Sequence, residues 1–187
     1  MNKLRVGLID SGVTGHPVAA SRSFLPAPGG SVFCEDALAD QLGHGTAIAG
    51  ILLESTPDVA LFNAQVFATR LSCSAVQVAT ALSWLVDEGV QLVNMSFGLA
   101  EDRPVLRDAC ERAIDKGVIL IAAAPARGEP VYPSSYPDVI RATGDARCME
   151  GEIQKFYGKV NNSLFDAGGF ASPLITHSKK PHLSGNN

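Results

Sequence analysis

The stretch Val6-Gly7-Leu8-Ile9-Asp10-Ser11-Gly12 is a short apolar run that ends in an aspartate and a polar turn. Similar runs recur along the chain and alternate with stretches whose apolar residues have helical spacing. That alternation is typical of a parallel sheet with helices on its faces. The predicted strands are 4–9, 59–66, 92–95, 118–123 and 139–142, and the predicted helices are 45–54, 75–88 and 105–116. Because several of the strands are almost continuously apolar, as strands buried on both faces are, the sequence predicts an α/β fold with a mostly parallel sheet.

The composition is that of an ordinary globular domain. The chain has 187 residues, of which 46% are hydrophobic and 18% charged, so one compact domain over 1–187 is expected. The net charge is −4 without a cluster of Lys or Arg, which argues against nucleic-acid and anionic-membrane partners. No apolar stretch reaches the ~20 residues that a membrane span requires. Because the first residues also lack a secretory signal, a cytoplasmic location is expected.

Neither a metal nor a cofactor is expected from the sequence. The acidic residues Glu35, Asp36 and Asp40 are too loosely spaced to resemble a calcium loop. Four cysteines lie far apart with no zinc or redox spacing, and they are interpreted as reduced, mostly buried thiols: Cys34, Cys73, Cys110 and Cys148. After residue 144, glycine, proline and asparagine interrupt every run, so turns and short strands packed on the same core are predicted there.

Two residues stand where chemistry is often found in α/β proteins. Asp10 ends the first predicted strand, and sites assemble at the carboxyl ends of parallel strands. An aspartate before Ser-Gly also makes a simple turn. His44 lies in Gly43-His44-Gly45-Thr46-Ala47-Ile48-Ala49-Gly50, where flanking glycines leave room for another backbone, such as that of a substrate. A histidine at a helix start can also merely cap or pack.

Taken together, the Asp10-Ser11-Gly12 and His44–Gly50 motifs resemble, in order, the first two of the three signatures of the subtilase (subtilisin-like, peptidase S8) family. Asn94-Met95-Ser96-Phe97-Gly98 resembles the family strand that lines the pocket for the residue before the scissile bond. Ala64-Gln65-Val66-Phe67 is similar to the edge strand that pairs with extended substrate. The resemblance extends from about residue 5 to residue 187, and the segments 118–124 and 132–137 add to it.

The resemblance implies a subtilisin-like three-layer fold and a serine endopeptidase with an Asp-His-Ser triad. In that triad Asp10 orients the imidazole and His44 is the general base. The substrate-binding residues implied in the same way are Val66, Ser96, Phe97, Gly98 and Ala124. The implied partner is a peptide or protein substrate.

The nucleophile departs from the family pattern. The resemblance implies a serine in a late Gly-Thr-Ser-x-Ala-x-Pro motif at the start of a helix, whereas the chain ends Leu183-Ser184-Gly185-Asn186-Asn187. Asn187 falls on the nucleophile position, where asparagine cannot attack, and the nucleophile helix is expected to be absent. Two interpretations remain open: a truncated or self-processed protease, and a natural pseudo-protease.

The oxyanion region departs as well. The family's Ala-Ala-Gly-Asn is replaced by Ala123-Ala124-Pro125-Ala126-Arg127-Gly128, so Ala126 offers no side-chain amide to a developing oxyanion. Arg127 is a candidate replacement donor, or else an exposed arginine on a loop.

Two functions are compatible with these motifs, and a third is disfavoured. The first is a serine endopeptidase that acts in intracellular processing or maturation of a specific protein or peptide. In its brevity and its missing asparagine the chain is similar to the small subtilases that remove a leader peptide during quinohemoprotein amine dehydrogenase biogenesis. The alternative is a non-catalytic pseudo-protease that binds peptide in the subtilase groove. A nucleotide-binding α/β protein is disfavoured because Asp10-Ser11-Gly12-Val13 is not a Gly-rich phosphate loop.

Overall fold

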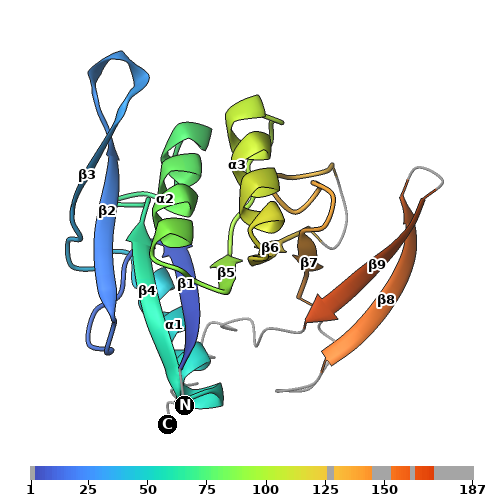
Figure 1. The fold of residues 1–187 in the computed structure, drawn as a ribbon, viewed down its shortest axis with the longest axis horizontal. Helices are drawn as coiled ribbons and strands as arrows, with labels where there is room; N and C mark the ends of the chain where they lie inside the picture. The colour runs from blue at the N-terminus through green and yellow to red at the C-terminus, as the bar shows by residue number, and fades with distance from the viewer. Residues whose placement is uncertain (1–2, 126–128, 145–152, 161–162, 171–187) are drawn as a thin grey trace, which may run out of the picture. The chain divides into compact units, whose positions relative to one another are not determined.

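The computed structural model describes residues 3–125, 129–144, 153–160 and 163–170. The chain divides into two compact units, 1–141 and 142–187. The main sheet has seven strands in the order β3-β2-β4-β1-β5-β6-β7, with β1 at its centre (Figure 1). Its strands are β1 (Leu4–Asp10), β2 (Ala20–Pro26), β3 (Val32–Asp36), β4 (Val59–Gln65), β5 (Leu92–Met95), β6 (Ile119–Ala123) and β7 (Ile140–Ala142). The helices are α1 (His44–Ser55), α2 (Ala75–Asp87) and α3 (Pro104–Asp115), with a short 3-10 turn, η1 (Pro28–Gly30).

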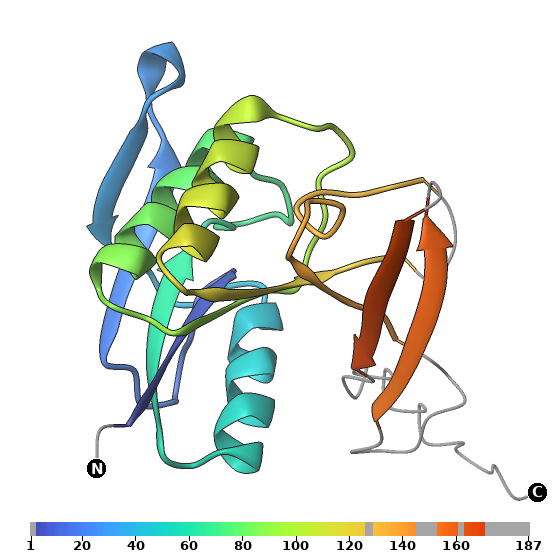
Figure 2. The ribbon, with the colours of Figure 1, turned by 45° about the vertical axis from the view of Figure 1, so that its right-hand side comes forward.

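The helices cover both faces of this sheet. Helices α2 and α3 lie on one face and α1 lies on the other (Figure 2). The central strand, β1, contributes side chains to the packing on both faces, because successive side chains of a strand point in opposite directions. Val6 and Leu8 pack with Ala49 of α1, whereas Ile9 belongs to the cluster that includes Leu85 of α2. The three-layer α/β fold predicted from the sequence is therefore confirmed.

The strands of the sheet are mostly parallel. β1 pairs in parallel with β4 and with β5, and β5 pairs in parallel with β6. β3, in contrast, is antiparallel to β2. Because the parallel strands run the same way, the carboxyl ends of β1, β4 and β5 meet at one edge of the sheet, and the candidate site lies there.

The sequence missed two strands, β2 and β3. β2 (Ala-Ser-Arg-Ser-Phe-Leu-Pro) has polar residues in its first half and therefore no long apolar run. Only Ser23 and Phe24 are buried in it. Four of the five residues of β3 are exposed. An apolar run marks a strand that is covered on both faces, and these two strands near the edge of the sheet are not covered in that way.

Residues 142–187 contain a separate antiparallel pair of strands, β8 (Ile153–Val160) and β9 (Ser163–Phe170). The prediction of short strands is wrong here, because each strand has eight residues. Gly158, Gly168 and Gly169 suggested breaks in the sequence, yet all three are paired within the hairpin. The packing of this segment on the main core, and a single domain over 1–187, stay predictions.

The cysteines that the structure describes are free thiols in three different environments. Cys110 is buried, Cys73 is half-buried and Cys34 is exposed on β3, so the prediction of burial is wrong for Cys34. Burial raises the pKa of the Cys73 and Cys110 thiols to about 12. Cys148 lies outside the described residues.

None of the helices in the described part of the chain is both long and apolar enough to cross a membrane. Among the same residues, no group of three or more His, Cys, Asp or Glu side chains is arranged to hold a metal ion.

Candidate active site

The site is built around a pair formed by Asp10 and His44. Asp10 is the last residue of β1, and its side chain is fully buried. His44 is the first residue of α1, and 35% of its side chain is exposed. The two meet in a hydrogen bond of 2.8 Å between His44 Nδ1 and Asp10 Oδ1, and the same oxygen accepts the Ser11 N–H at 2.7 Å. A buried carboxylate thus holds one imidazole nitrogen and leaves the other free for chemistry.

Close packing of two backbone segments explains why these residues meet. A Cβ added to Gly45 would lie 2.3 Å from the carbonyl oxygen of Gly12. The Gly45 N–H also donates to Ser11 Oγ at 2.9 Å. The room that glycine leaves beside His44 is therefore filled by the chain's own backbone, and the prediction that it admits a substrate is wrong for Gly45. Gly43 has a different role, because its φ of 74° is the left-handed conformation that glycine adopts without strain.

The electrostatics of His44 favour its charged form. The hydrogen bond to Asp10 raises the pKa of His44 above the ordinary value of 6.5. Partial burial opposes this shift, while the negative charges of Asp10 and Asp40 add to it. His44 is thus arranged to accept a proton and to be stabilised once it carries one.

We expect an NMR titration of the His44 ring, assigned with a His44→Gln variant, to give a midpoint above pH 6.5. Since the folded-state pKa is the higher one, the stability that His44 adds is fully present below pH 6.5. It is lost as the pH rises through the folded-state midpoint. Urea unfolding of the wild type and His44→Gln between pH 5.5 and 9 should show their difference shrinking over that range. A midpoint at or below 6.5 would contradict the structure.

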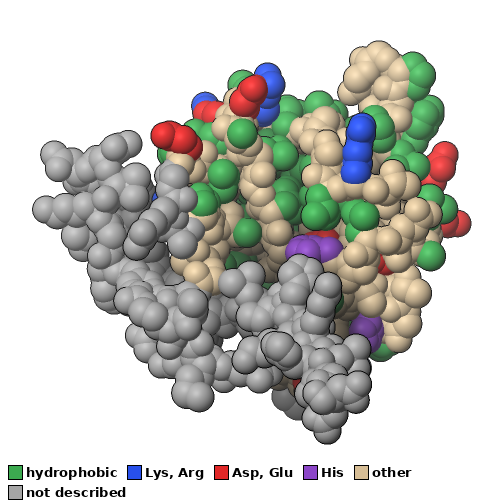
Figure 3. Space-filling view, turned by 180° about the vertical axis from the view of Figure 1, so that it is seen from behind, with side chains coloured by type: hydrophobic (Ala, Val, Ile, Leu, Met, Phe, Trp, Pro, Cys, Tyr) green, Lys and Arg blue, Asp and Glu red, His purple; other side chains and the backbone are tan. Residues whose placement is uncertain are grey.

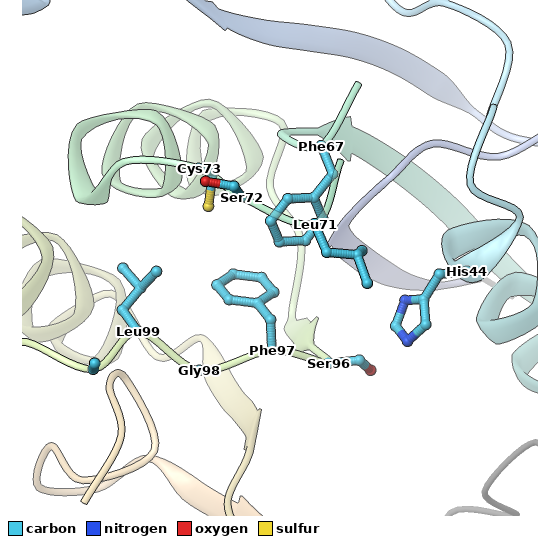
Figure 4. Close-up of a pocket in the computed structure, with 10 residues that line it drawn as sticks. His44, Phe67, Leu71, Ser72, Cys73, Ser96, Phe97, Gly98 and Leu99 are labelled. Carbon is cyan, nitrogen blue, oxygen red and sulfur yellow. The ribbon is translucent and has the colours of Figure 1, made fainter. Parts of the chain in front are cut away.

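A pocket opens beside His44. Ten residues line it: His44, Phe67, Leu71, Ser72, Cys73, Ser96, Phe97, Gly98, Leu99 and Ala100 (Figure 4). The Phe67 and Phe97 rings meet edge to face with centroids 5.3 Å apart. Both described histidines are visible on the face in Figure 3, and hydrophobic side chains gather beside the one nearer its centre. This pocket is mostly apolar and carries the histidine at its rim.

The Ser96–Phe97–Gly98 segment is held by neighbours on both sides. Asn94 Nδ2 donates to Ser96 Oγ at 2.8 Å. Leu99 and Tyr132 form a two-way backbone bridge, with N···O distances of 2.7 and 2.8 Å. Gly98 packs so closely on Val131 that an added Cβ would lie 2.5 Å from its Cγ2. The structure thus brings all three predicted pocket residues together beside His44.

The remaining predicted site residues either do not line the pocket or lie outside the described residues. The edge-strand prediction for 64–67 is wrong, because β4 lies inside the sheet between β2 and β1. Val66 is buried, and its N–H donates to the carbonyl oxygen of Asp10 at 2.8 Å, so that N–H is not free to pair with a substrate. Ala124 directly follows β6 and is half-buried. Ala126, Arg127 and Asn187 lie outside the described residues.

The sequence did not predict two residues that hold the site together, Gln65 and Asp40. Gln65 is fully buried, donates from Nε2 to the Ser11 carbonyl at 2.8 Å and accepts the Leu38 N–H at 2.9 Å. Asp40 accepts hydrogen bonds from the turn that carries His44. A glutamine at the end of a mostly apolar strand was a usable signal, because a buried polar group has to find partners.

Comparison with known proteins agrees with the fold and with the Asp10–His44 pair. Residues 2–176 match the Subtilase family (Peptidase_S8), and the chain belongs to this family. Subtilisin DY from Bacillus licheniformis is 30% identical over 97% of this chain and 74% of its own. The thermostable alkaline protease of Halalkalibacterium halodurans is 28% identical over 98% of this chain. The chain spans only 55% of that protease.

Solved structures show the same fold. The nisin leader peptidase NisP from Lactococcus lactis superimposes with a TM-score of 0.64 at 23% identity, over 78% of this chain and 56% of its own. A lanthipeptide protease gives a TM-score of 0.63 at 23% identity, over 76% of this chain and 48% of its own. The chain thus spans about half the length of these structures.

Proposed function

We propose that this protein is a serine endopeptidase in which Asp10 and His44 are two members of a catalytic triad. His44 takes the proton of a serine hydroxyl as that oxygen attacks the peptide carbonyl, and returns it to the leaving amine. Asp10 keeps the proton of the neutral ring on Nδ1, so that Nε2 is the free base. The observation that carries this proposal is the 2.8 Å hydrogen bond from His44 Nδ1 to a fully buried carboxylate.

The pocket beside His44 supports a peptide as the substrate. Its apolar walls suit side chains of an extended peptide, and the Ser96–Gly98 segment lines the pocket together with the histidine. Relatives are named as proteases, and two solved structures with this fold are named as leader-peptide and lanthipeptide proteases. We infer that the protein processes a specific precursor protein or peptide.

A fluorophosphonate probe, which reacts only with an activated serine, tests this function. The protein expressed from its complete gene is expected to gain the mass of one probe, and His44→Ala is expected to abolish the labelling. His16→Ala is the matched control, because His16 is the other described histidine and does not line the pocket. Labelling that survives His44→Ala would overturn the proposed mechanism. A folded wild type that binds peptide but takes no probe would instead identify a pseudo-protease.

A further inference from the structure

The Asp40 carboxylate collects four hydrogen bonds around the turn that carries His44. Asp40 Oδ1 accepts the backbone N–H groups of Leu42 and Gly43 at 3.0 and 2.9 Å. Asp40 Oδ2 accepts the backbone N–H and the hydroxyl of Thr46 at 3.0 and 2.6 Å. The donors come from both sides of His44 in the sequence. One carboxylate therefore fixes the backbone that precedes the imidazole and the backbone that follows it.

The same residue ties this turn to the loop that follows β1. The Asp40 N–H donates to Thr14 Oγ1 at 2.9 Å, and the Thr14 N–H donates to Thr46 Oγ1 at 3.1 Å. A Cβ added to Gly12 would lie 3.3 Å from Asp40 Cβ. The loop that follows Asp10 and the turn that carries His44 are therefore joined through Asp40, in addition to the hydrogen bond between Asp10 and His44.

Asp40 is charged in this setting. Partial burial alone would raise its pKa, but the hydrogen bonds from Thr46 and Gly43 outweigh burial and hold the pKa of Asp40 below its usual 3.8. At neutral pH a second negative charge thus lies close to His44. Such a charge stabilises an imidazolium that forms when the ring takes up a proton.

No other described group around His44 offers such a charge. Asp10 approaches the ring from β1, and Asp40 approaches it from the loop before α1. The pocket side is lined by uncharged residues; among them Cys73 is titratable, and its raised pKa of about 12 keeps it neutral. Among the described residues, these two carboxylates are therefore the ones whose charge acts on His44.

We propose that Asp40 is a positioning residue that holds the His44 turn against the loop that follows Asp10 and supplies a second negative charge to the imidazole. Its importance for catalysis rests on the endopeptidase function proposed above. The coupling between Asp40 and His44 does not rest on it, since it belongs to the folded chain as such.

The test is a pair of NMR titrations on the folded chain. Asp40→Asn, which removes the charge but keeps one acceptor oxygen, is expected to lower the titration midpoint of His44. Glu54→Gln is the matched control, because it removes one carboxylate charge from α1, the helix that His44 begins. Glu54 lies about 15 Å along the helix from His44, at 1.5 Å per residue. It is expected to leave the His44 midpoint unchanged.

The reciprocal titration needs no change at Asp40. His44→Gln is expected to raise the pKa of the Asp40 carboxyl, because it removes the positive charge that His44 carries at acidic pH. The two shifts express one coupling free energy and have to agree. The proposal is overturned if His44→Gln leaves the Asp40 pKa unchanged. It is also overturned if the His44 titration midpoint in folded Asp40→Asn is the same as that in Glu54→Gln.

Fluorophosphonate labelling separates this proposal from the proposed function. In the protein from the complete gene, Asp40→Asn is expected to slow labelling and to move the acidic limb of its pH profile to lower pH. A defect that leaves the protonation of His44 unchanged would lower the rate and leave the limb in place. If the wild type takes no label but both titrations shift, the coupling stands and the endopeptidase function fails.

Discussion

Replacing Asp10 with asparagine is expected to lower the rate of fluorophosphonate labelling about 10⁴-fold, by analogy with the loss of kcat that the same change in the triad aspartate causes in a known serine protease. An asparagine that turns its amide towards His44 Nδ1 would donate a hydrogen to it. The ring would then carry its proton on Nε2, the nitrogen that must accept the serine proton. The rate is to be measured in the protein from the complete gene, at several pH values.

Asp58→Asn provides the control for this substitution. The Asp58 side chain is 97% exposed and lies 3.8 Å from Lys3, in a surface ion pair of the kind that contributes little. The control is expected to label like the wild type. On the folded chain, Asp10→Asn is also expected to lower the His44 titration midpoint, since it removes the main cause of the raised pKa. Unchanged labelling in Asp10→Asn would remove Asp10 from the mechanism.

Gly45→Ala is expected to lower the free energy of unfolding by about 3 kcal/mol, the upper end of the usual range for overpacking. The new Cβ would lie 2.3 Å from the Gly12 carbonyl oxygen and 3.1 Å from Asp10 Cβ. A backbone oxygen cannot rotate away as the tip of a side chain can. Either α1 or the loop after β1 has to move, and the hydrogen bond between Asp10 and His44 stretches. Urea unfolding measures the loss, and the His44 midpoint should fall towards 6.5.

Gly50→Ala is the matched control in the same helix. Its Cβ would lie 3.3 Å from His16 Nε2, the end of a side chain that can rotate. Because alanine favours a helix interior by about 1 kcal/mol over glycine, the control is expected to be neutral or slightly stabilising. Equal losses in the two variants would show that the contact with Gly12 does not constrain the site.

The sequence predicted the covered elements well, because a strand between two helical layers has to be apolar almost throughout. The predicted strand 92–95 coincides with β5, and the predicted helices differ from the observed ones by one residue at each end or less. β3 was not predictable in this way, because its mostly exposed residues leave no pattern. The hairpin of β8 and β9 was missed for another reason, since glycines within a strand look like breaks when the partner strand is unknown.

The residues of the candidate site that belong to a local sequence motif were predictable. Those whose role depends on tertiary contacts were not. Asp10 and His44 were found from their local motifs, and the structure joins them at 2.8 Å. Asp40 was missed, because its role depends on hydrogen bonds to Thr14 and Thr46 that its spacing from other acidic residues does not indicate. Val66 was placed on an edge strand, whereas β4 is interior, and strand order is not written in any local pattern.

The position of β1 at the centre of the sheet has a consequence for synthesis. Both of its partners are made much later, since Leu4 pairs with Val59 and Val6 pairs with Leu92. At about 5–20 residues per second, a ribosome takes roughly 4–17 s to proceed from the end of β1 to the end of β5. For that time the apolar first strand has left the tunnel without its neighbours. A chaperone that binds nascent chains would therefore be expected to bind this segment during that interval, and overproduction without one to favour inclusion bodies.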